Sequence, residues 1–314
     1  MQVLFVNRYF APDHSATSQM VGDLAFFLAG RGHDVVAITS RQRYDDASAR
    51  LAPREGLNGV DVIRVATTRF GRGFLPGRAL DYATFYLSAF FALLRHARRG
   101  DIVVAMTDPP LLSVVAALAC SLRGARLVNW TQDLFPEVAT ALGMRAPGLA
   151  RPLRDWSLRR ATMNVALGEQ MAARIRARGA PAVVRHNWAD AALHPIENSA
   201  LRAQWGLGDA FVVAYSGNLG RAHEFATIAA AMRRLGDNAG IKFLFVGSGA
   251  QLDAVRREAG GNALFAPYQP REALSESLSA GDAHLVSLQP QLEGLIVPSK
   301  FYGILAVARP VLFV

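Results

Sequence analysis

The chain has 314 residues, of which 51% are hydrophobic and 19% are charged, and its formal net charge is +9 at pH 7. This composition excludes a disordered chain, because enough apolar surface is available to form a core, and the length suggests two domains of roughly 150 residues each. The basic balance suits a phosphorylated substrate or an anionic lipid surface, but no cluster of Lys and Arg with interleaved aromatics is present, so we expect no nucleic-acid partner.

Cys120 is the only cysteine, which excludes an intrachain disulfide and indicates a reducing compartment. The first predicted strand begins at Val3, so no room is left for a secretory signal peptide. We therefore expect a cytoplasmic protein. Peripheral attachment to the inner face of the plasma membrane is a further expectation, argued below from one helix.

In the first half of the chain, apolar β-branched runs alternate with helical patterns. In the helix predicted at Ser15–Arg31, for example, apolar residues recur at helical spacing. Strands that are apolar on both faces and separated by helices indicate a parallel sheet covered on both sides, that is, a Rossmann-like domain. The predicted strands are Val3–Val6, Asp34–Thr39, Val60–Val65, Asp101–Met106, Arg126–Trp130, Met163–Leu167 and Ala182–Arg185.

The segment His186–Asp209 has no strand pattern and is interpreted as an interdomain connection, so we place the domains at 1–190 and 191–314. A second Rossmann-like series follows it. Because the chain stops in the apolar strand Val311–Val314, we expect this second domain to be truncated at its C-terminal end. The predicted elements are strands Phe211–Tyr215, Lys242–Val246, Ala263–Phe265 and Ala283–Leu288, and helices Glu224–Leu235, Gln251–Glu258 and Pro270–Ser279.

One predicted helix, Leu80–Leu94, is apolar almost all round and is followed by Arg95. It is shorter than the ~20 residues that cross a bilayer, so it is either a buried core helix or a segment that lies in the membrane interface. The glycine-rich loop before it combines basic and apolar residues, which favours contact with anionic head groups. The predicted membrane contacts are Arg69, Phe70, Arg72, Phe74 and Arg78.

The sequence lacks the motifs of several common nucleotide-binding and metal-binding sites. The turn after the first strand lacks G-x-G-x-x-G, no Walker A sequence is present, and the histidines form no His-Glu-x-x-His. There is also no Asp-x-Asp pair, and one cysteine excludes a thiolate metal site. We therefore expect neither a cofactor nor a metal.

Two turns of the second domain are suited to binding a diphosphate. In YSGNLGRAHE, Gly217 and Gly220 allow backbone amides to approach a ligand, and Arg221 offers bidentate hydrogen bonds. In EGLIVPSK, Ser299 is expected to cap a helix, and Lys300 lies in its first turn, where a cation is unfavourable unless an anion binds there. A surface arginine and an ordinary βα crossover with a solvated lysine remain the alternatives, and Gly247 in FVGSG is a weaker signal of the same kind.

Taken together, YSGNLGRAHEF, FLFVGSGA and LEGLIVPSKFYGILAVARPVL resemble the second domain of retaining GT-B glycosyltransferases of family 4. YFAPDHSAT, LAGRGHDVVAIT and NWTQDLFPE are similar to first-domain pieces of the same group, so the resemblance covers essentially the whole chain. It is nearest to bacterial transferases that build surface polysaccharides. It implies an α/β fold with two Rossmann-like domains facing across a cleft, and transfer of a hexosyl or N-acetylhexosaminyl group.

The resemblance also implies the ligands and the site. The donor would be a nucleoside diphosphate sugar, most often a UDP-sugar, and the acceptor lipid-linked or an oligosaccharide. Glu293 would position the sugar hydroxyls and Asp133 would face the reacting sugar or acceptor, while the leaving phosphate oxygen takes the acceptor's proton. Donor contacts are expected at Gly217, Asn218, Gly220, Arg221, Gly247, Gly294, Pro298, Ser299 and Lys300.

Two departures from the family pattern affect these assignments. The second glutamate that the family commonly carries would fall at Gly303, counted back from Pro310, and Gln132 precedes Asp133 where many relatives have histidine. Asp133 could instead cap a helix beginning at Leu134–Pro136. Two other classes of function stay open: a nucleotide-sugar epimerase, which needs no second sugar acceptor, and a non-catalytic, truncated, membrane-docked partner.

Overall fold

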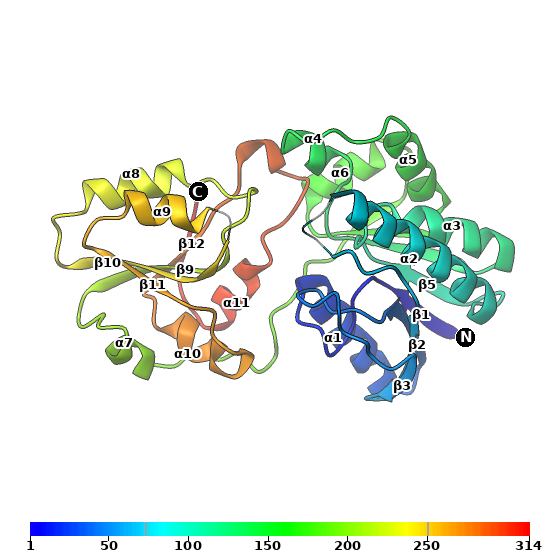
Figure 1. The fold of residues 1–314 in the computed structure, drawn as a ribbon, viewed down its shortest axis with the longest axis horizontal. Helices are drawn as coiled ribbons and strands as arrows, with labels where there is room; N and C mark the ends of the chain where they lie inside the picture. Colours follow the sequence, from blue (N-terminus) through cyan, green and yellow to red (C-terminus); the bar gives the residue numbers. More distant parts are fainter. Residues whose placement is uncertain (72, 74, 250) are drawn as a thin grey trace. The chain divides into compact units, whose positions relative to one another are not determined.

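The computed structural model describes residues 1–314 except 72, 74 and 250. The chain forms two compact units (Figure 1). The first comprises Met1–His186 with Gly294–Val297, and the second comprises Asn187–Glu293 with Pro298–Val314. The short segment Gly294–Val297 therefore packs with the first unit although both of its neighbours along the chain belong to the second.

The first unit contains an eight-stranded sheet in the order β3-β4-β2-β1-β5-β6-β7-β8. All pairings are parallel except β3 with β4, which is antiparallel at the edge. The order reverses between β1 and β5. The strands are β1 Gln2–Val6, β2 Asp34–Ser40, β3 Arg54–Leu57, β4 Val60–Val65, β5 Ile102–Ala105, β6 Arg126–Thr131, β7 Met163–Ala166 and β8 Ala182–Val184.

Helices cover both faces of this sheet, as the apolar character of both faces requires. Val3 and Phe5 of β1 pack with α1 on one face, and Leu4 and Val6 pack with α2 and α3 on the other. The helices are α1 Ala16–Gly30, α2 Leu75–His96, α3 Leu112–Arg123, α4 Glu137–Ala141, α5 Ala150–Arg160 and α6 Glu169–Arg176.

The second unit contains a five-stranded parallel sheet in the order β11-β10-β9-β12-β13, which reverses between β9 and β12. Its strands are β9 Phe211–Asn218, β10 Ile241–Ser248, β11 Ala263–Ala266, β12 Ala283–Val286 and β13 Val311–Phe313. Its helices are α7 Ala200–Gln204, α8 Ala226–Arg234, α9 Leu252–Glu258, α10 Leu274–Ser279 and α11 Lys300–Ala306, with short 3-10 turns η1 Arg271–Ala273 and η2 Pro290–Leu292.

These two Rossmann-like units confirm the predicted α/β class, and three local predictions need correction. The strand Arg54–Leu57 was missed because a short run with two charges and a glycine carries no apolar pattern. The connection His186–Asp209 includes the helix α7. The helix predicted at Pro270–Ser279 divides into a 3-10 turn followed by α10.

The predicted helix Leu80–Leu94 is the central part of α2, and its two faces differ. Phe85, Ala89 and Leu93 are fully buried in the first core, whereas Leu87 and Phe91 are exposed. The core interpretation is therefore right for one face only. Among the described residues, no helix is long and apolar enough to cross a membrane. Of the predicted membrane contacts, Arg72 and Phe74 lie outside the described residues.

Candidate active-site residues in the two domains

The candidate binding turn that follows β9 lies where the sheet of the second unit reverses its strand order. Open parallel α/β sheets bind ligands at such a point. β9 ends in the predicted turn, and its last residues pair with the end of β10, Gly217 opposite Gly247 and Asn218 opposite Ser248. The sheet thus brings both glycine-containing turns to one edge.

Gly217 and Gly247 are glycines for a structural reason. Both have positive φ, +124° and +133°, which L side chains rarely adopt. A Cβ on Gly247 would lie 2.3 Å from the carbonyl oxygen of Gly217. The backbones of the two turns therefore approach as closely as they do because Gly247 has no side chain. Ligand contact by these glycines stays a prediction.

Lys300 points back across this edge. Its Nζ lies 3.8 Å from the centroid of the Tyr215 ring and donates a hydrogen bond to the Tyr215 hydroxyl, and a Cβ on Gly217 would lie 3.5 Å from Nζ. Burial lowers the pKa of Lys300 to about 7, because desolvation disfavours the charged form. No carboxylate contacts Nζ among the described residues. Lys300 is thus half-buried rather than a fully solvated crossover lysine, and its role as an anion contact stays a prediction.

Two aromatic residues that support Lys300 were not assigned a role from the sequence. Tyr215 is fully buried and stacks edge-on against His223, with the ring centroids 5.7 Å apart. His223 Nδ1 lies 2.7 Å from the Ser287 carbonyl oxygen, at the end of β12. Burial and the nearby Lys300 lower the pKa of His223 to about 4, so the imidazole is neutral at neutral pH. A tyrosine ending the strand and a histidine in the turn were visible in the motif, but their contact with Lys300 depends on packing.

The remaining residues of the two turns have simpler surroundings. Arg221 is exposed and has no ion-pair partner within the described part of the chain. Gly220 accepts a hydrogen bond from the Gln251 side chain at 3.0 Å. Ser299 occupies the N-cap position of α11, but its side chain makes no capping hydrogen bond because its backbone is already helical, with φ −64° and ψ −27°. The predicted N-cap position of Ser299 is therefore confirmed, but its side chain forms no capping hydrogen bond.

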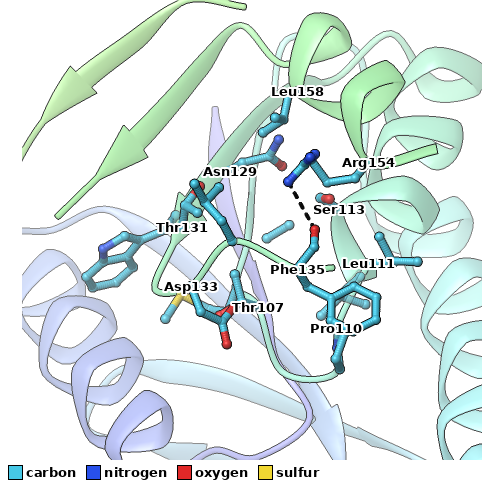
Figure 2. A pocket seen from close by; sticks show the side chains of 15 residues that line it. Thr107, Pro110, Leu111, Ser113, Asn129, Thr131, Asp133, Phe135, Arg154 and Leu158 are labelled. Atoms are coloured by element: carbon cyan, nitrogen blue, oxygen red, sulfur yellow. Dashed lines mark hydrogen bonds between the residues drawn. The ribbon is translucent and has the colours of Figure 1, made fainter. Parts of the chain in front are cut away.

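A small pocket opens at the C-terminal ends of β5 and β6 in the first unit (Figure 2). Its walls combine apolar side chains such as Leu111 and Phe135 with polar groups such as Asn129 and Asp133. Leu111 has φ +65°, and α3 begins one residue later. The pocket holds space for about one water-sized group, ~30 Å³.

The carboxylate of Asp133, in the wall of this pocket, has a raised pKa. Burial and the neighbouring Asp108 raise its pKa to about 6, although Thr107 donates a hydrogen bond to it. Its Oδ1 is buried and has no hydrogen-bond partner among the described residues. The backbone of Asp133 bridges Ile296, and α4 begins only at Glu137. Asp133 therefore does not cap a helix, and it keeps an acceptor atom available to a ligand hydroxyl.

A buried arginine holds the loop that carries Asp133. Arg154 donates to the Phe135 carbonyl oxygen at 3.1 Å (Figure 2). It also donates to both carboxylate oxygens of Glu137, at 2.8 and 2.6 Å. Burial raises the pKa of Glu137, but Arg154 and Arg178 outweigh it and lower the value to about 2. The loop that carries Asp133 is thus fixed by ion pairs of Arg154 and Arg178 with Glu137.

The predicted segment after η2 is divided between the units. Glu293 is exposed and is the last residue of the second unit before this segment. Gly294 belongs to the first unit, and a Cβ added to it would lie 2.9 Å from Gln170 Cβ. Leu295 accepts a backbone hydrogen bond from Leu134 at 2.9 Å. The structure therefore places Gly294 with the loop of Asp133, while Pro298, Ser299 and Lys300 belong to the second unit.

Two Rossmann-like domains in one chain are the architecture of the GT-B fold. Structural comparison agrees: sucrose-phosphate synthase from Thermosynechococcus elongatus superposes with a TM-score of 0.77 at 15% identity, and Anabaena HepE in complex with UDP superposes with a TM-score of 0.68 at 14%. Each match covers 99% of this chain and 80% of the other.

Residues 16–188 match the family described as the glycosyl transferase 4-like domain, and the chain belongs to this family of transferase enzymes. It is 27% identical to Escherichia coli K12 WcaI, named for a glycosyl transferase role in colanic acid biosynthesis, over 98% of this chain and 81% of the relative. It is 30% identical to Pseudomonas aeruginosa WbjE, named as a glycosyltransferase, over 76% of this chain and 62% of the relative.

Proposed function

We propose that the protein transfers a sugar from a nucleoside diphosphate sugar, with UDP as the nucleotide, to a lipid-linked or oligosaccharide acceptor in surface polysaccharide biosynthesis. The observation that carries the proposal is the half-buried, largely desolvated Lys300 beside Gly217 and Tyr215 at the sheet reversal. A buried cation without a carboxylate partner is costly unless an anion completes the site. The names of WcaI and of the HepE–UDP complex support the pathway and the nucleotide.

In the proposed reaction, the bond between the anomeric carbon and the diphosphate breaks while the acceptor oxygen bonds to the same carbon from the same face. Configuration is thus retained, and the leaving phosphate oxygen takes the acceptor's proton. Lys300 and Arg221 stabilise the charge that develops on the diphosphate, and stabilisation of this kind often contributes more to catalysis than any other effect. Asp133 accepts a hydrogen bond from a hydroxyl of the acceptor or sugar, and Glu293 positions the sugar.

The proposed reaction uses protein cations where other transferases use a metal. The described residues include no group of three His, Cys, Asp or Glu side chains placed to hold a metal ion. Independence from divalent metals stays a prediction.

Calorimetry with UDP and uridine tests the donor site. Lys300→Ala and Arg221→Ala should each weaken UDP binding by about 1.5–3 kcal/mol, the loss expected for a charge-assisted contact, and should leave uridine binding nearly unchanged. Arg256→Ala, which removes an exposed arginine that stacks on Phe265 in the same unit, is the matched control. Equal losses for UDP and uridine would contradict the assignment.

A further inference from the structure

The outer surface of α2 exposes apolar side chains in a helical stripe. Its buried positions, Phe85, Ala89 and Leu93, recur every fourth residue and face the first core. The positions on the opposite side follow the same period, and there Leu87 and Phe91 are 62% and 64% exposed. Single exposed apolar side chains are common on protein surfaces, whereas apolar side chains that cluster on one face often mark an interaction site.

The neighbouring helix α3 continues this surface. α2 and α3 lie side by side on one face of the sheet (Figure 1). Leu118 and Leu122 of α3 are one helical turn apart and exposed, Leu122 by 68%. We call Leu80, Leu87 and Phe91 of α2, together with Leu118 and Leu122 of α3, the outer helix face.

The exposed charges on these two helices have one sign. Asp81 is the only acidic residue of α2, and it is fully buried, where it accepts hydrogen bonds from the backbone N–H groups of Phe70 and Gly71. α3 contains no acidic residue. The exposed charged residues at the C-terminal ends of the helices are arginines, Arg95 on α2 and Arg123 on α3, and Arg98 follows α2.

We infer that the outer helix face binds the surface of an anionic lipid bilayer. Its leucines and Phe91 would enter the interface while the arginines contact acidic head groups, the arrangement by which amphipathic helices lie on membranes. Charge decides between this occupant and a second copy of the chain. Two copies joined through this face would bring arginines together, whereas anionic head groups neutralise them.

The position of α3 relates this surface to the proposed acceptor. α3 begins at Leu112, which lines the pocket beside Asp133, and the Tyr86 hydroxyl of α2 donates to the carbonyl oxygen of Pro110 in the same wall. At 1.5 Å per residue, Leu118 and Leu122 lie about 9 and 15 Å further along the helix axis. This inference rests on the proposed function in one respect: a lipid-linked acceptor anchored under this face would have its head group near Asp133.

Vesicle co-sedimentation with two matched double variants tests the inference. Phe91→Gln/Arg95→Gln removes an exposed aromatic and the arginine four residues later from the outer helix face. Phe27→Gln/Arg31→Gln removes the same pair from α1, on the other face of the same sheet, where Arg31 stacks on Phe27. The wild type should bind phosphatidylglycerol-containing vesicles, and more weakly at high salt. The first variant should bind about tenfold more weakly, and the second like the wild type.

Other results would overturn the inference. The first is that the wild type does not bind anionic vesicles, and the second is that both variants lose vesicle binding equally. The third is that the wild type is a dimer and the Phe91→Gln/Arg95→Gln variant alone is a monomer. Unchanged melting temperatures establish that both variants are folded. The vesicle assay contains no nucleotide and no acceptor, so it does not depend on the proposed function. A protein that binds vesicles but transfers no sugar would contradict the proposed function and leave the membrane inference standing.

Discussion

Lys300 shows how a residue's environment, rather than its identity, makes a site. The chain contains 34 Lys and Arg residues, of which only Lys242 and Lys300 are lysines. An ammonium group loses its proton on burial far more readily than a guanidinium group does. The pKa of Lys300 is lowered to about 7, so the lysine is partly neutral in the free protein at neutral pH. A bound anion would favour its charged form.

We predict that nucleotide-sugar binding takes up a proton near pH 7. The free protein holds roughly half a proton on Lys300 at this pH, and a bound diphosphate raises the lysine's pKa again. Calorimetry in two buffers of different ionisation enthalpy should show uptake of about half a proton at pH 7, rising toward about one proton at higher pH, where the free lysine is neutral, while the affinity falls. Lys300→Met should abolish the uptake and Lys242→Met should preserve it. Uptake that persists in Lys300→Met would show that another group titrates.

The same lysine has a defined effect on stability. Its folded-state pKa lies below the ordinary 10.5, so the unfolded chain binds more protons between about pH 7 and 10.5. The free energy of unfolding of the unliganded protein should therefore rise with pH in this window as far as Lys300 contributes. A ligand that stabilises the charged lysine offsets this cost at neutral pH.

Sequence reasoning singled out Lys300 and Arg221 as candidate diphosphate contacts, but it did not find the residues that surround them. Lys300 and Arg221 stand out because cations at turns before helices are unusual. Tyr215 and His223 were missed, since their role depends on contact with a residue 85 positions away in the Tyr215–Lys300 pair. The raised pKa of Asp133 could not be predicted either, because the burial that causes it depends on the packing around it.

At the scale of elements, the strands were the most predictable feature. Buried parallel strands are continuous apolar runs, so the predicted starts and ends differ little from β1, β4 or β6. The polar edge strand β3 and the short helix α7 carry no such pattern. The exposed side of α2 was also unpredictable, because its outward and inward residues are equally apolar.

The paired turns at the ends of β9 and β10 give a prediction about an element junction. Gly247→Ala should lower the free energy of unfolding of the second unit by about 2 kcal/mol or more, because a Cβ would meet the Gly217 carbonyl oxygen and the φ is unsuited to alanine. Gly261→Ala is the control, since nothing lies within 4 Å of its added Cβ. Urea unfolding measures both. If the two variants prove equally stable, the close approach of the turns is not a constraint.

On the scale of the whole molecule, the two units carry different parts of the proposed chemistry. The second holds the cations for the diphosphate, and the first holds Asp133 in its pocket. Substitutions in the second unit should therefore weaken nucleotide binding, while a substitution of Asp133 should affect transfer alone. An epimerase would not need the acceptor pocket.

The most direct test is transfer of radiolabelled sugar from UDP-sugars to a bacterial lipid extract. The wild type should label the lipid fraction. Asp133→Asn should bind UDP normally, but its transfer rate should fall at least about a hundredfold. This loss is typical of a polar group that acts in the transition state. Lys300→Ala should lose both binding and transfer. Isomerised sugar nucleotide without labelled lipid, or full activity of Asp133→Asn, would contradict the assignment of a transferase with its acceptor site beside Asp133.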